Sequence, residues 1–358
     1  MTRILVVRLK AIGDLLLSTA FLRALRKARP QAEIHLLTTR SCEPVVRHSP
    51  RIDRVLLHPE PGASWGERLR FFRDLRSARY GQVFDLGATP RSAWITLATG
   101  APERIGFDFR IRKWAFTCPV PRNRVRKFQS LVVMDLLKPL GIPGDGDATE
   151  LFLGPEEEEW ARRYFGSPPV SELGRRIGIN PTGTWPSKRW PEGLWRETAV
   201  LIHGKMGVKP ILFGGPDDDA LLASVREGIE DKTLVKPSTT LLEAAAFIAG
   251  LDVLLGSDGT PQHLAQALGT PSLTLWGPGW GLGWTKPSDP RHRYLQNFLD
   301  CGPCDRTRCP YPEEAGRAPH TRRECLTRWS PSAVVEALQR LLDATSGRRR
   351  MSSRAVEQ

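Results

Sequence analysis

The stretch VLLGSDGTPQHLAQALGTPSLTLW, residues 253–276, decides the fold class. Apolar runs at 253–255 and 272–275 are short and nearly continuous, as in strands that are buried on both faces of a parallel sheet. Between them, residues 261–268 have a helical pattern. A strand, a helix and a second strand in this order form the crossover unit of a parallel sheet. The stretch therefore predicts an α/β fold.

The same alternation of strand and helix patterns occurs in both halves of the chain. A length of 358 residues is too great for one ordinary core, so two domains are expected. We predict two doubly wound, Rossmann-like domains facing a cleft, over residues 1–150 and 171–330. A final amphipathic helix is expected over 331–345, followed by a disordered basic tail over 346–358. The predicted strands lie at residues 4–7, 34–37, 55–57, 83–86, 177–179, 210–213, 253–255 and 272–275, and the predicted helices at 12–28, 192–205, 217–229, 240–249 and 261–268.

The positive charge is concentrated in the first part of the chain. Residues 1–130 contain 25 Lys and Arg against 10 Asp and Glu, a net charge of +15, whereas the remainder contains 27 against 29, a net charge of −2. Such a field favours an anionic partner (a nucleic acid, a membrane surface or an acidic substrate) unless it serves only solubility. The sequence has no run of about 18 apolar residues, and charge soon interrupts the N-terminal apolar run. We therefore expect a cytoplasmic protein without a transmembrane segment.

A first polar turn, RLKAIGD at residues 8–14, follows the first predicted strand. Ligands of open parallel sheets bind beyond the carboxyl ends of the strands, so such turns are candidate sites. Gly13 permits a tight backbone, and Asp14 lies at the start of the next predicted helix. Asp14 is either a carboxylate that serves a ligand or a residue that caps the helix.

A second turn, NPTGTWPSKRWP at residues 180–191, opens the second predicted domain. Backbone N–H groups and the hydroxyls of Thr184 and Ser187 can donate hydrogen bonds to a phosphate, and Lys188 supplies a positive charge. The spacing matches neither a Walker loop nor the dinucleotide-binding glycine pattern. The turn is either a phosphate site of another kind or a solvated loop with packed tryptophans.

The third turn contains Asp258, Gly259, Thr260 and His263, within the stretch quoted first. The start of its helix offers free N–H groups beside Gly259 and Thr260, and the helix dipole favours an anion there. Asp258 cannot bind that anion itself, but it can accept hydrogen bonds from sugar hydroxyls or orient His263. A single histidine of this kind is either structural or functional.

The three turns together resemble glycosyltransferase family 9, the ADP-heptose:lipopolysaccharide heptosyltransferases. The similarity is carried by RLKAIGDLLLSTAFLRALRKARP, INPTGTWPSKRWP and SDGTPQHLAQALGTPSLTLWGP, and it spans residues 1 to about 345. The resemblance implies a GT-B fold with an N-terminal acceptor domain and a C-terminal donor domain. It implies inverting, metal-independent transfer of heptose from ADP-L-glycero-D-manno-heptose to the inner core of lipopolysaccharide, a Kdo-lipid A type acceptor, with no further cofactor. The positive first domain then meets an acidic lipid at the inner face of the inner membrane.

The resemblance also assigns roles to individual residues. Asp14 matches the family's candidate general base, and Lys188 matches a ligand of the donor diphosphate. Thr184 and Ser187 occupy the neighbouring hydroxyl positions, and the family's D-[ST]-G-x-x-H motif falls on Asp258 and His263. This sequence reads Asp-Gly-Thr there, so Gly259 and Thr260 have exchanged the places of the glycine and the hydroxyl. All eight of these residues are predicted site residues: Asp14, Thr184, Ser187, Lys188, Asp258, Gly259, Thr260 and His263.

Four cysteines follow the last predicted strand, at positions 301, 304, 309 and 325, with His320 between the last two. The C-x-x-C pair and the two further cysteines have metal-like spacing, but the intervals are not those of a zinc ribbon. A related branch that modifies autotransporter adhesins is similar in carrying a cysteine-bound iron. A structural metal, a disulfide and reduced cysteines that only pack are the open alternatives, and no metal is predicted at the catalytic site.

Two other functions compete with this interpretation. The first is a GT-B transferase that uses another nucleotide sugar or a protein acceptor, because nothing in the residues alone specifies heptose. The second is a nucleic-acid-binding protein, which the sequence pI of about 9.9 favours. The sequence contains no helix-turn-helix, RRM or KH signature, so we predict no nucleic-acid partner.

Overall fold

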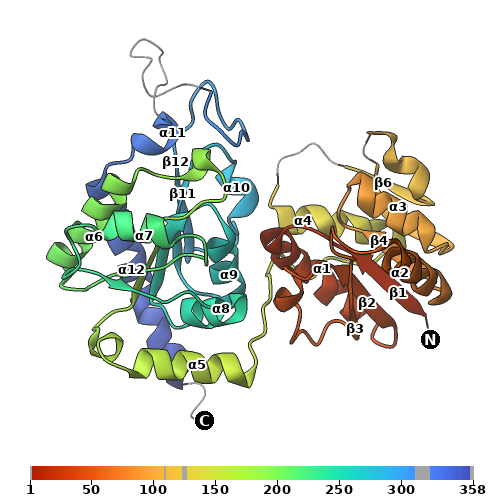
Figure 1. Ribbon diagram of the computed structural model, residues 1–358, viewed down its shortest axis with the longest axis horizontal. Coiled ribbons are helices and arrows are strands. Elements are labelled where there is room, and N and C mark those ends of the chain that lie inside the picture. The colour runs from red at the N-terminus through yellow and green to blue at the C-terminus, as the bar shows by residue number, and fades with distance from the viewer. Residues whose placement is uncertain (1, 109, 123–126, 311–322, 355–358) are drawn as a thin grey trace. The chain divides into compact units, whose positions relative to one another are not determined.

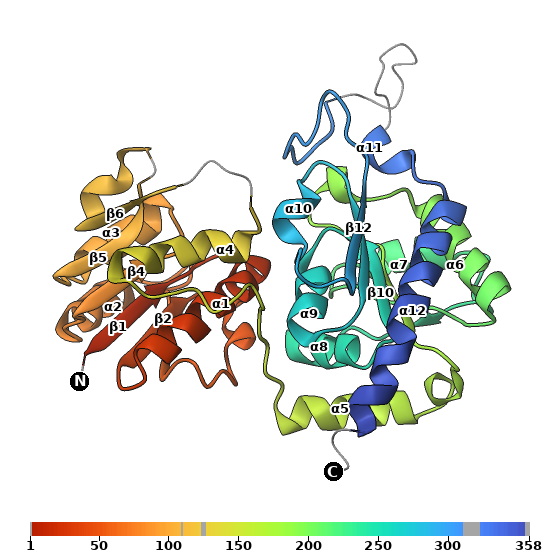
Figure 2. The same ribbon diagram turned by 180° about the vertical axis from the view of Figure 1, so that it is seen from behind.

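The computed structural model describes residues 2–108, 110–122, 127–310 and 323–354. The chain divides into two compact units, Met1–Phe152 and Leu153–Gln358, and each unit has its own sheet. Figures 1 and 2 show the first unit in red to yellow and the second in green to blue.

The first unit contains a six-stranded parallel sheet in the order β3-β2-β1-β4-β5-β6. The chain starts at β1 in the middle, proceeds outward to β3 and returns to β4 on the other side of β1. This is the Rossmann order, and its switch point lies between β1 and β4. Val7 and Asp85 end these two strands and are direct partners across them. The strands are β1 (Arg3–Val7), β2 (Glu33–Thr38), β3 (Arg54–Leu57), β4 (Gln82–Asp85), β5 (Glu103–Asp108) and β6 (Cys118–Pro121).

Helices cover both faces of this sheet. Val83 packs with Leu75 of α2 and Ile95 of α3 on one face, whereas its neighbour Phe84 meets Phe21 of α1 edge-on, 5.2 Å between ring centroids, on the other. Successive strand residues point to opposite faces, so both faces must be apolar, which explains the continuous apolar runs. The helices are α1 (Ile12–Ala28), α2 (Trp65–Ser77), α3 (Pro90–Ala98) and α4 (Gln129–Met134), with 3₁₀ turns η1 (Glu43–Val45), η2 (Arg110–Ala115) and η3 (Asp135–Leu140).

The second unit repeats the same topology. Its parallel sheet has the order β12-β11-β10-β7-β8-β9, so the first strand, β7, again lies beside the fourth, β10. Asn180, the last residue of β7, pairs with Gly256 near the end of β10, and the switch point lies between them. The strands are β7 (Ile177–Asn180), β8 (Ile211–Leu212), β9 (Leu234–Val235), β10 (Val253–Ser257), β11 (Ser272–Trp276) and β12 (His292–Gln296).

The helices of the second unit share a core with its sheet. Figure 2 shows α12, in dark blue, crossing the unit close to β12, and its residues Val334, Leu338 and Leu341 belong to the same buried cluster as Trp195 of α6. The helices are α5 (Pro155–Gly166), α6 (Glu192–Met206), α7 (Asp219–Arg226), α8 (Leu241–Ala249), α9 (Thr260–Leu268), α10 (Gly281–Trp284), α11 (Glu324–Thr327) and α12 (Pro331–Arg354), with 3₁₀ turns η4 (Val170–Glu172) and η5 (Pro186–Lys188).

The end of α12 differs from the prediction of a disordered tail over 346–358. The helix continues to Arg354, and residues 355–358 lie outside the described part of the chain. The packed part of α12 nucleates the helix, so each further residue needs only to propagate it. No proline follows to stop it, and arginine is a good helix former. Among the described residues, no helix has both the length and the apolar character needed to cross a bilayer.

Candidate active site

Asp14 lies in the first turn of α1, shortly after the carboxyl end of β1. Its Oδ2 accepts a hydrogen bond from the Ala11 backbone N–H at 3.0 Å, and its Oδ1 forms an ion pair with Arg8 Nη2 at 2.7 Å. The side chain is nevertheless 32% exposed. Asp14 therefore caps the helix, which was one interpretation of the sequence, and its carboxylate remains accessible for a second role.

Arg8 connects the two sides of the switch point in the first unit. Its Nη2 holds Asp14, and its Nη1 donates to the backbone carbonyl of Leu86, the residue after β4. A guanidinium presents several donors in a rigid plane, so it can hold two acceptors in fixed directions. Arg8 thus orients Asp14 relative to β4. The sequence placed Arg8 in the first turn without a role, because its partners depend on the strand order.

Asp85 is a second carboxylate at this edge of the sheet, and sequence analysis missed it. It ends β4 and is fully buried. Its Oδ1 accepts a hydrogen bond from the Gly87 N–H at 2.8 Å, whereas Oδ2 has no hydrogen-bond partner among the described residues. Burial raises the pKa of Asp85 to about 6, although the hydrogen bonds from the Gly87 and Ala88 N–H groups and the charge of Arg8 act in the opposite direction. In the sequence, the feature that could have identified Asp85 is a carboxylate directly after the apolar residues of a predicted strand.

We expect Asp85→Asn to change how stability depends on pH. The pKa of Asp85 rises from 3.8 to about 6 on folding, so the native state binds the proton more tightly than the unfolded chain. Asp85 therefore makes the wild type lose stability as the pH rises from about 4 to about 6, by up to ~3 kcal/mol. Asparagine does not titrate, so the melting temperature of the variant relative to the wild type should increase over this range. A difference that is constant with pH would contradict this account.

Lys188 and Asp258 join the second and third predicted turns. Lys188 Nζ lies 2.6 Å from Asp258 Oδ2, and both side chains are largely buried. The turns begin side by side because β7 and β10 are neighbours. Burial raises the pKa of Asp258, and the adjacent Lys188 opposes this rise. The Lys188 ammonium also lies 4.4 Å from the centre of the Trp185 ring. The second unit thus has a buried cation at its switch point, balanced by one carboxylate.

The two hydroxyl residues of the second turn differ in their surroundings. Thr184 is exposed, and its hydroxyl forms no hydrogen bond with the residues that the structure describes. Ser187 is buried; its Oγ donates to the Arg306 carbonyl at 2.6 Å, and its N–H donates to the Thr307 carbonyl at 3.3 Å. Thr184 is therefore free to donate to an anion, whereas Ser187 fastens the turn to the loop that follows β12. The role of each toward a ligand stays a prediction.

The third turn places its remaining predicted residues at the start of α9. Gly259 is the N-cap in an extended conformation, and Thr260 is the first helical residue, where backbone N–H groups have no partner within the helix. His263 is buried one turn further, with its ring 5.9 Å from that of Trp284. The opening of α9 can therefore receive an anion through its N–H groups, beside the Lys188–Asp258 pair.

A further turn at this edge escaped the sequence analysis. It follows β8 and contains Gly214, Gly215 and Asp218, with Asp218 Oδ2 accepting the Gly215 N–H at 2.8 Å. A Cβ on Gly214 would lie 2.7 Å from the Asp218 Cβ and 3.1 Å from the Thr182 Cγ2, so only glycine fits. The backbone of this turn therefore approaches the second turn closely. In the sequence, the segment FGGPDDD directly after an apolar run could have identified this turn.

The four cysteines after β12 are free thiols. Cys301, Cys304 and Cys309 lie on one loop, and Cys325 lies on α11. Burial raises the pKa of Cys325 to about 11, with smaller contributions from the three other thiols. Among the described residues, no three metal-ligating side chains are grouped so that they could hold an ion. His320, which the sequence associated with these cysteines, lies outside the described residues.

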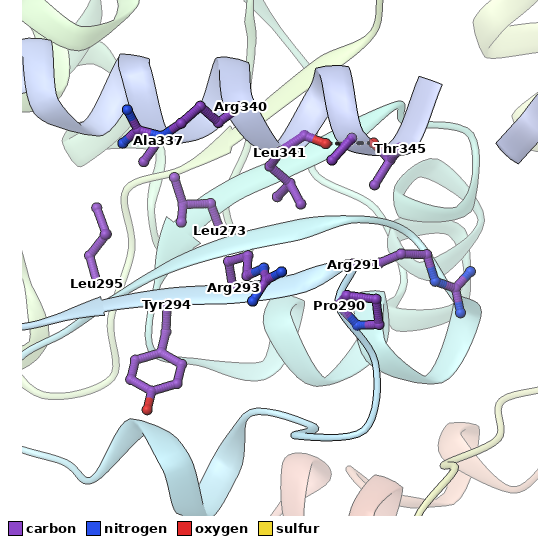
Figure 3. Close-up of a pocket in the computed structure, with 11 residues that line it drawn as sticks. Leu273, Pro290, Arg291, Arg293, Tyr294, Leu295, Ala337, Arg340, Leu341 and Thr345 are labelled. Carbon is purple, nitrogen blue, oxygen red and sulfur yellow. Dashed lines mark hydrogen bonds between the residues drawn. The ribbon is translucent and has the colours of Figure 1, made fainter. Parts of the chain in front are cut away.

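The pocket drawn in Figure 3 lies elsewhere in the second unit. It has a volume of about 370 Å³ and lies between β12 and α12, where Leu341 of α12 faces Leu273 of β11. Arg293 and Arg340 also line it. None of the predicted site residues contributes to this pocket, because it opens on a helix-covered face of the sheet rather than at the carboxyl ends of the strands.

Comparison with known proteins gives concordant results. The family model of glycosyltransferase family 9 (heptosyltransferase) matches residues 68–314. Lipopolysaccharide heptosyltransferase 1 of Pseudomonas aeruginosa is 25% identical, and the similarity covers 95% of this chain and 98% of that protein. A family 9 glycosyl transferase from Veillonella parvula superimposes with a TM-score of 0.80 at 23% identity, covering 95% of this chain and 97% of that one. The ADP-heptose lipopolysaccharide heptosyltransferase II of Escherichia coli gives a TM-score of 0.75 at 22% identity, covering 97% and 100%.

The family match extends over more than half of the chain, so this protein belongs to glycosyltransferase family 9. It is a glycosyltransferase, and the predicted membership of this family is confirmed. Its two Rossmann-like units are those of the GT-B fold, as predicted from the alternation of strands and helices.

Proposed function

We propose that this glycosyltransferase moves heptose from ADP-L-glycero-D-manno-heptose to the inner core of lipopolysaccharide, with a Kdo-lipid A type acceptor. The observation that carries the proposal is the Lys188–Asp258 pair at the switch point of the second unit, beside the start of α9. A buried ammonium and unpaired N–H groups at one sheet edge suit a diphosphate. Two of the proteins named above are heptosyltransferases, and the one from Escherichia coli is an ADP-heptose lipopolysaccharide heptosyltransferase.

In the proposed mechanism, the donor diphosphate is the leaving group. Lys188 and the unpaired N–H groups at the start of α9 stabilise the charge that develops on it, an electrostatic contribution that is often the largest in catalysis. The Thr184 hydroxyl donates a further hydrogen bond. Asp258 holds Lys188 in place and accepts hydrogen bonds from sugar hydroxyls. Lys188 supplies at this point the positive charge that a metal ion supplies in other transferases, which supports a metal-independent reaction.

The acceptor oxygen attacks the anomeric carbon from the face opposite the diphosphate, so the anomeric configuration inverts. As the new C–O bond forms, the acceptor hydroxyl transfers its proton to Asp14, which acts as general base. The bond from the anomeric carbon to the diphosphate breaks, and ADP leaves with the electron pair. Arg8 keeps the Asp14 carboxylate in a fixed direction through its second bond to the Leu86 carbonyl.

The proposed acceptor is an acidic lipid, and this agrees with the charge of the chain. Residues 1–130 carry a net charge of +15 from 25 basic and 10 acidic side chains. Each Lys or Arg near an anionic membrane surface contributes about 1 kcal/mol of attraction. We therefore place the enzyme in the cytoplasm, at the inner face of the inner membrane, where it works as a peripheral protein.

Selective donor binding tests the proposed function. We expect titration calorimetry to show binding of ADP-heptose at least tenfold tighter than binding of UDP- or GDP-sugars. A preference for a UDP- or GDP-sugar would overturn the heptose assignment and support a GT-B transferase of another specificity. Selective binding of ADP-heptose without transfer to a Kdo-lipid A acceptor would overturn the proposed acceptor and favour a protein acceptor.

A further inference from the structure

Helix α2 carries an apolar stripe that faces solvent. Trp65, Leu69 and Phe72 follow one another at intervals of four and three residues, so they lie on one side of the helix. Trp65 is 89% exposed and Leu69 is 73% exposed. The core side of the helix is a different one, formed by Leu75 and Phe71, which pack against β1 and β4. We call Trp65, Leu69 and Phe72 the α2 stripe.

The α2 stripe continues into neighbouring exposed aromatic residues. Phe72 and Trp94 of α3 line the same pocket, whose volume is about 240 Å³. Trp94 in turn contacts Trp114 of η2, with 4.8 Å between ring centroids. Among the described residues, six of the nine exposed large apolar side chains lie between positions 57 and 114. A continuous apolar surface of this kind marks an interaction site rather than ordinary surface variation.

Arginines surround this apolar surface. Arg68 and Arg91 line the pocket between α2 and α3, and Arg70 and Arg73 project from α2. Arg70 and Arg91 form no ion pair with the described residues. Helix α2 as a whole carries four arginines against Glu67 and Asp74. Tryptophan, leucine and phenylalanine beside unpaired arginines are the composition of helices that lie in the interface of an anionic membrane.

We propose that the α2 stripe, with Trp94 and Trp114 beside it, inserts into the headgroup region of an anionic lipid bilayer while the surrounding arginines contact the lipid phosphates. Charge complementarity selects this partner. A second copy of the chain would bring the same arginines to the surface and repel, whereas anionic lipids neutralise them. The proposal goes beyond the transfer reaction, because it assigns the surface by which the protein is held at a membrane and needs no bound sugar.

Vesicle sedimentation of the full chain tests the proposal. The wild type should bind vesicles of phosphatidylglycerol and phosphatidylcholine in equal amounts, and bind pure phosphatidylcholine weakly. The triple variant Trp65→Ser, Leu69→Ser, Phe72→Ser should lose at least about tenfold in partition coefficient, because the buried apolar area supplies much of the affinity. Its melting temperature should fall only slightly, since Trp65 and Leu69 are mostly exposed, although Phe72 is 38% exposed and contacts Phe71. Vesicles contain neither donor nor acceptor, so this result is independent of the donor assignment.

A matched control and a second readout make the test specific. The variant Leu282→Ser, Phe298→Ser removes two exposed apolar side chains from the second unit and should bind vesicles like the wild type. Brominated lipids should quench the fluorescence of the wild type more than that of Trp65→Phe. Unaltered binding of the triple variant, or equal quenching of the two proteins, would overturn the proposal. A stripe variant that turned an oligomer into a monomer would show a subunit interface instead.

Discussion

Asp14→Asn should reduce turnover by roughly a hundred- to ten-thousand-fold, the range that a general base contributes. The amide keeps the shape of the carboxylate and can still accept the Ala11 N–H, so the start of α1 should remain capped. It cannot take a proton from the acceptor hydroxyl. Donor affinity should change little, because Asp14 belongs to the first unit and the proposed donor ligands belong to the second. Single-turnover kinetics and titration calorimetry measure the two quantities separately.

A capping carboxylate elsewhere provides the control for Asp14. Glu157 accepts the Gly154 N–H at 2.9 Å at the start of α5, in the same capping arrangement as Asp14. Glu157→Gln should therefore leave turnover intact, and it should cost less stability than Asp14→Asn, which also weakens the ion pair with Arg8. Full activity of Asp14→Asn would exclude Asp14 as the general base and leave it as a capping residue. An equal loss of activity in Asp14→Asn and Glu157→Gln would lead to the same conclusion.

Lys188→Ala should weaken donor binding by about ten- to a hundredfold, as expected for the loss of a charged hydrogen-bond donor to the diphosphate. It should also lower stability, because Asp258 would remain buried without its partner. Breaking a buried ion pair from one side typically destabilises a protein by about 3–5 kcal/mol. Titration with ADP and thermal unfolding measure the two effects.

The two effects of Lys188→Ala can be separated with a second substitution. In Lys188→Ala, Asp258→Asn the uncompensated carboxylate is gone, so most of the lost stability should return. Donor affinity should not return, because the positive charge is still missing. Wild-type donor affinity in the single variant would exclude Lys188 as a diphosphate ligand, and recovery of affinity in the double variant would attribute the loss to the structural effect of Asp258.

Most of the central strands were predictable from the sequence. The strands that were missed lie at a sheet edge or next to one. β1, β2, β4, β7, β10 and β11 are buried on both faces, so their residues form apolar runs. Three of the four missed strands, β6, β9 and β12, are edge strands. β6 contains Pro119 and Pro121, which an edge tolerates because proline need not donate to a neighbour there. The fourth, β5, mixes charged and apolar residues beside the edge.

Individual residues of the candidate site could be proposed from the sequence, but their contacts could not. Asp14, Lys188 and Asp258 were identified because each follows a predicted strand. Their partners depend on information that local sequence lacks. The Lys188–Asp258 pair requires β7 to lie beside β10, and the bond from Ser187 to Arg306 joins residues 119 positions apart. Asp85 was overlooked because an acidic residue after an apolar run usually marks the point where a strand becomes exposed. Here the carboxylate itself is buried.

The shared strand order of the two units gives their first turns equivalent positions. In each unit the chain leaves the first strand at the switch point and turns into the first long helix. The first unit places a carboxylate in this position, at Asp14, and the second unit places an ammonium there, at Lys188. A single backbone plan, used twice, thus has side chains of opposite charge at one equivalent position. In the mechanism that we propose, one copy receives a proton and the other binds an anion, so a change in a few turn residues, without a new fold, separates the two chemical tasks of glycosyl transfer.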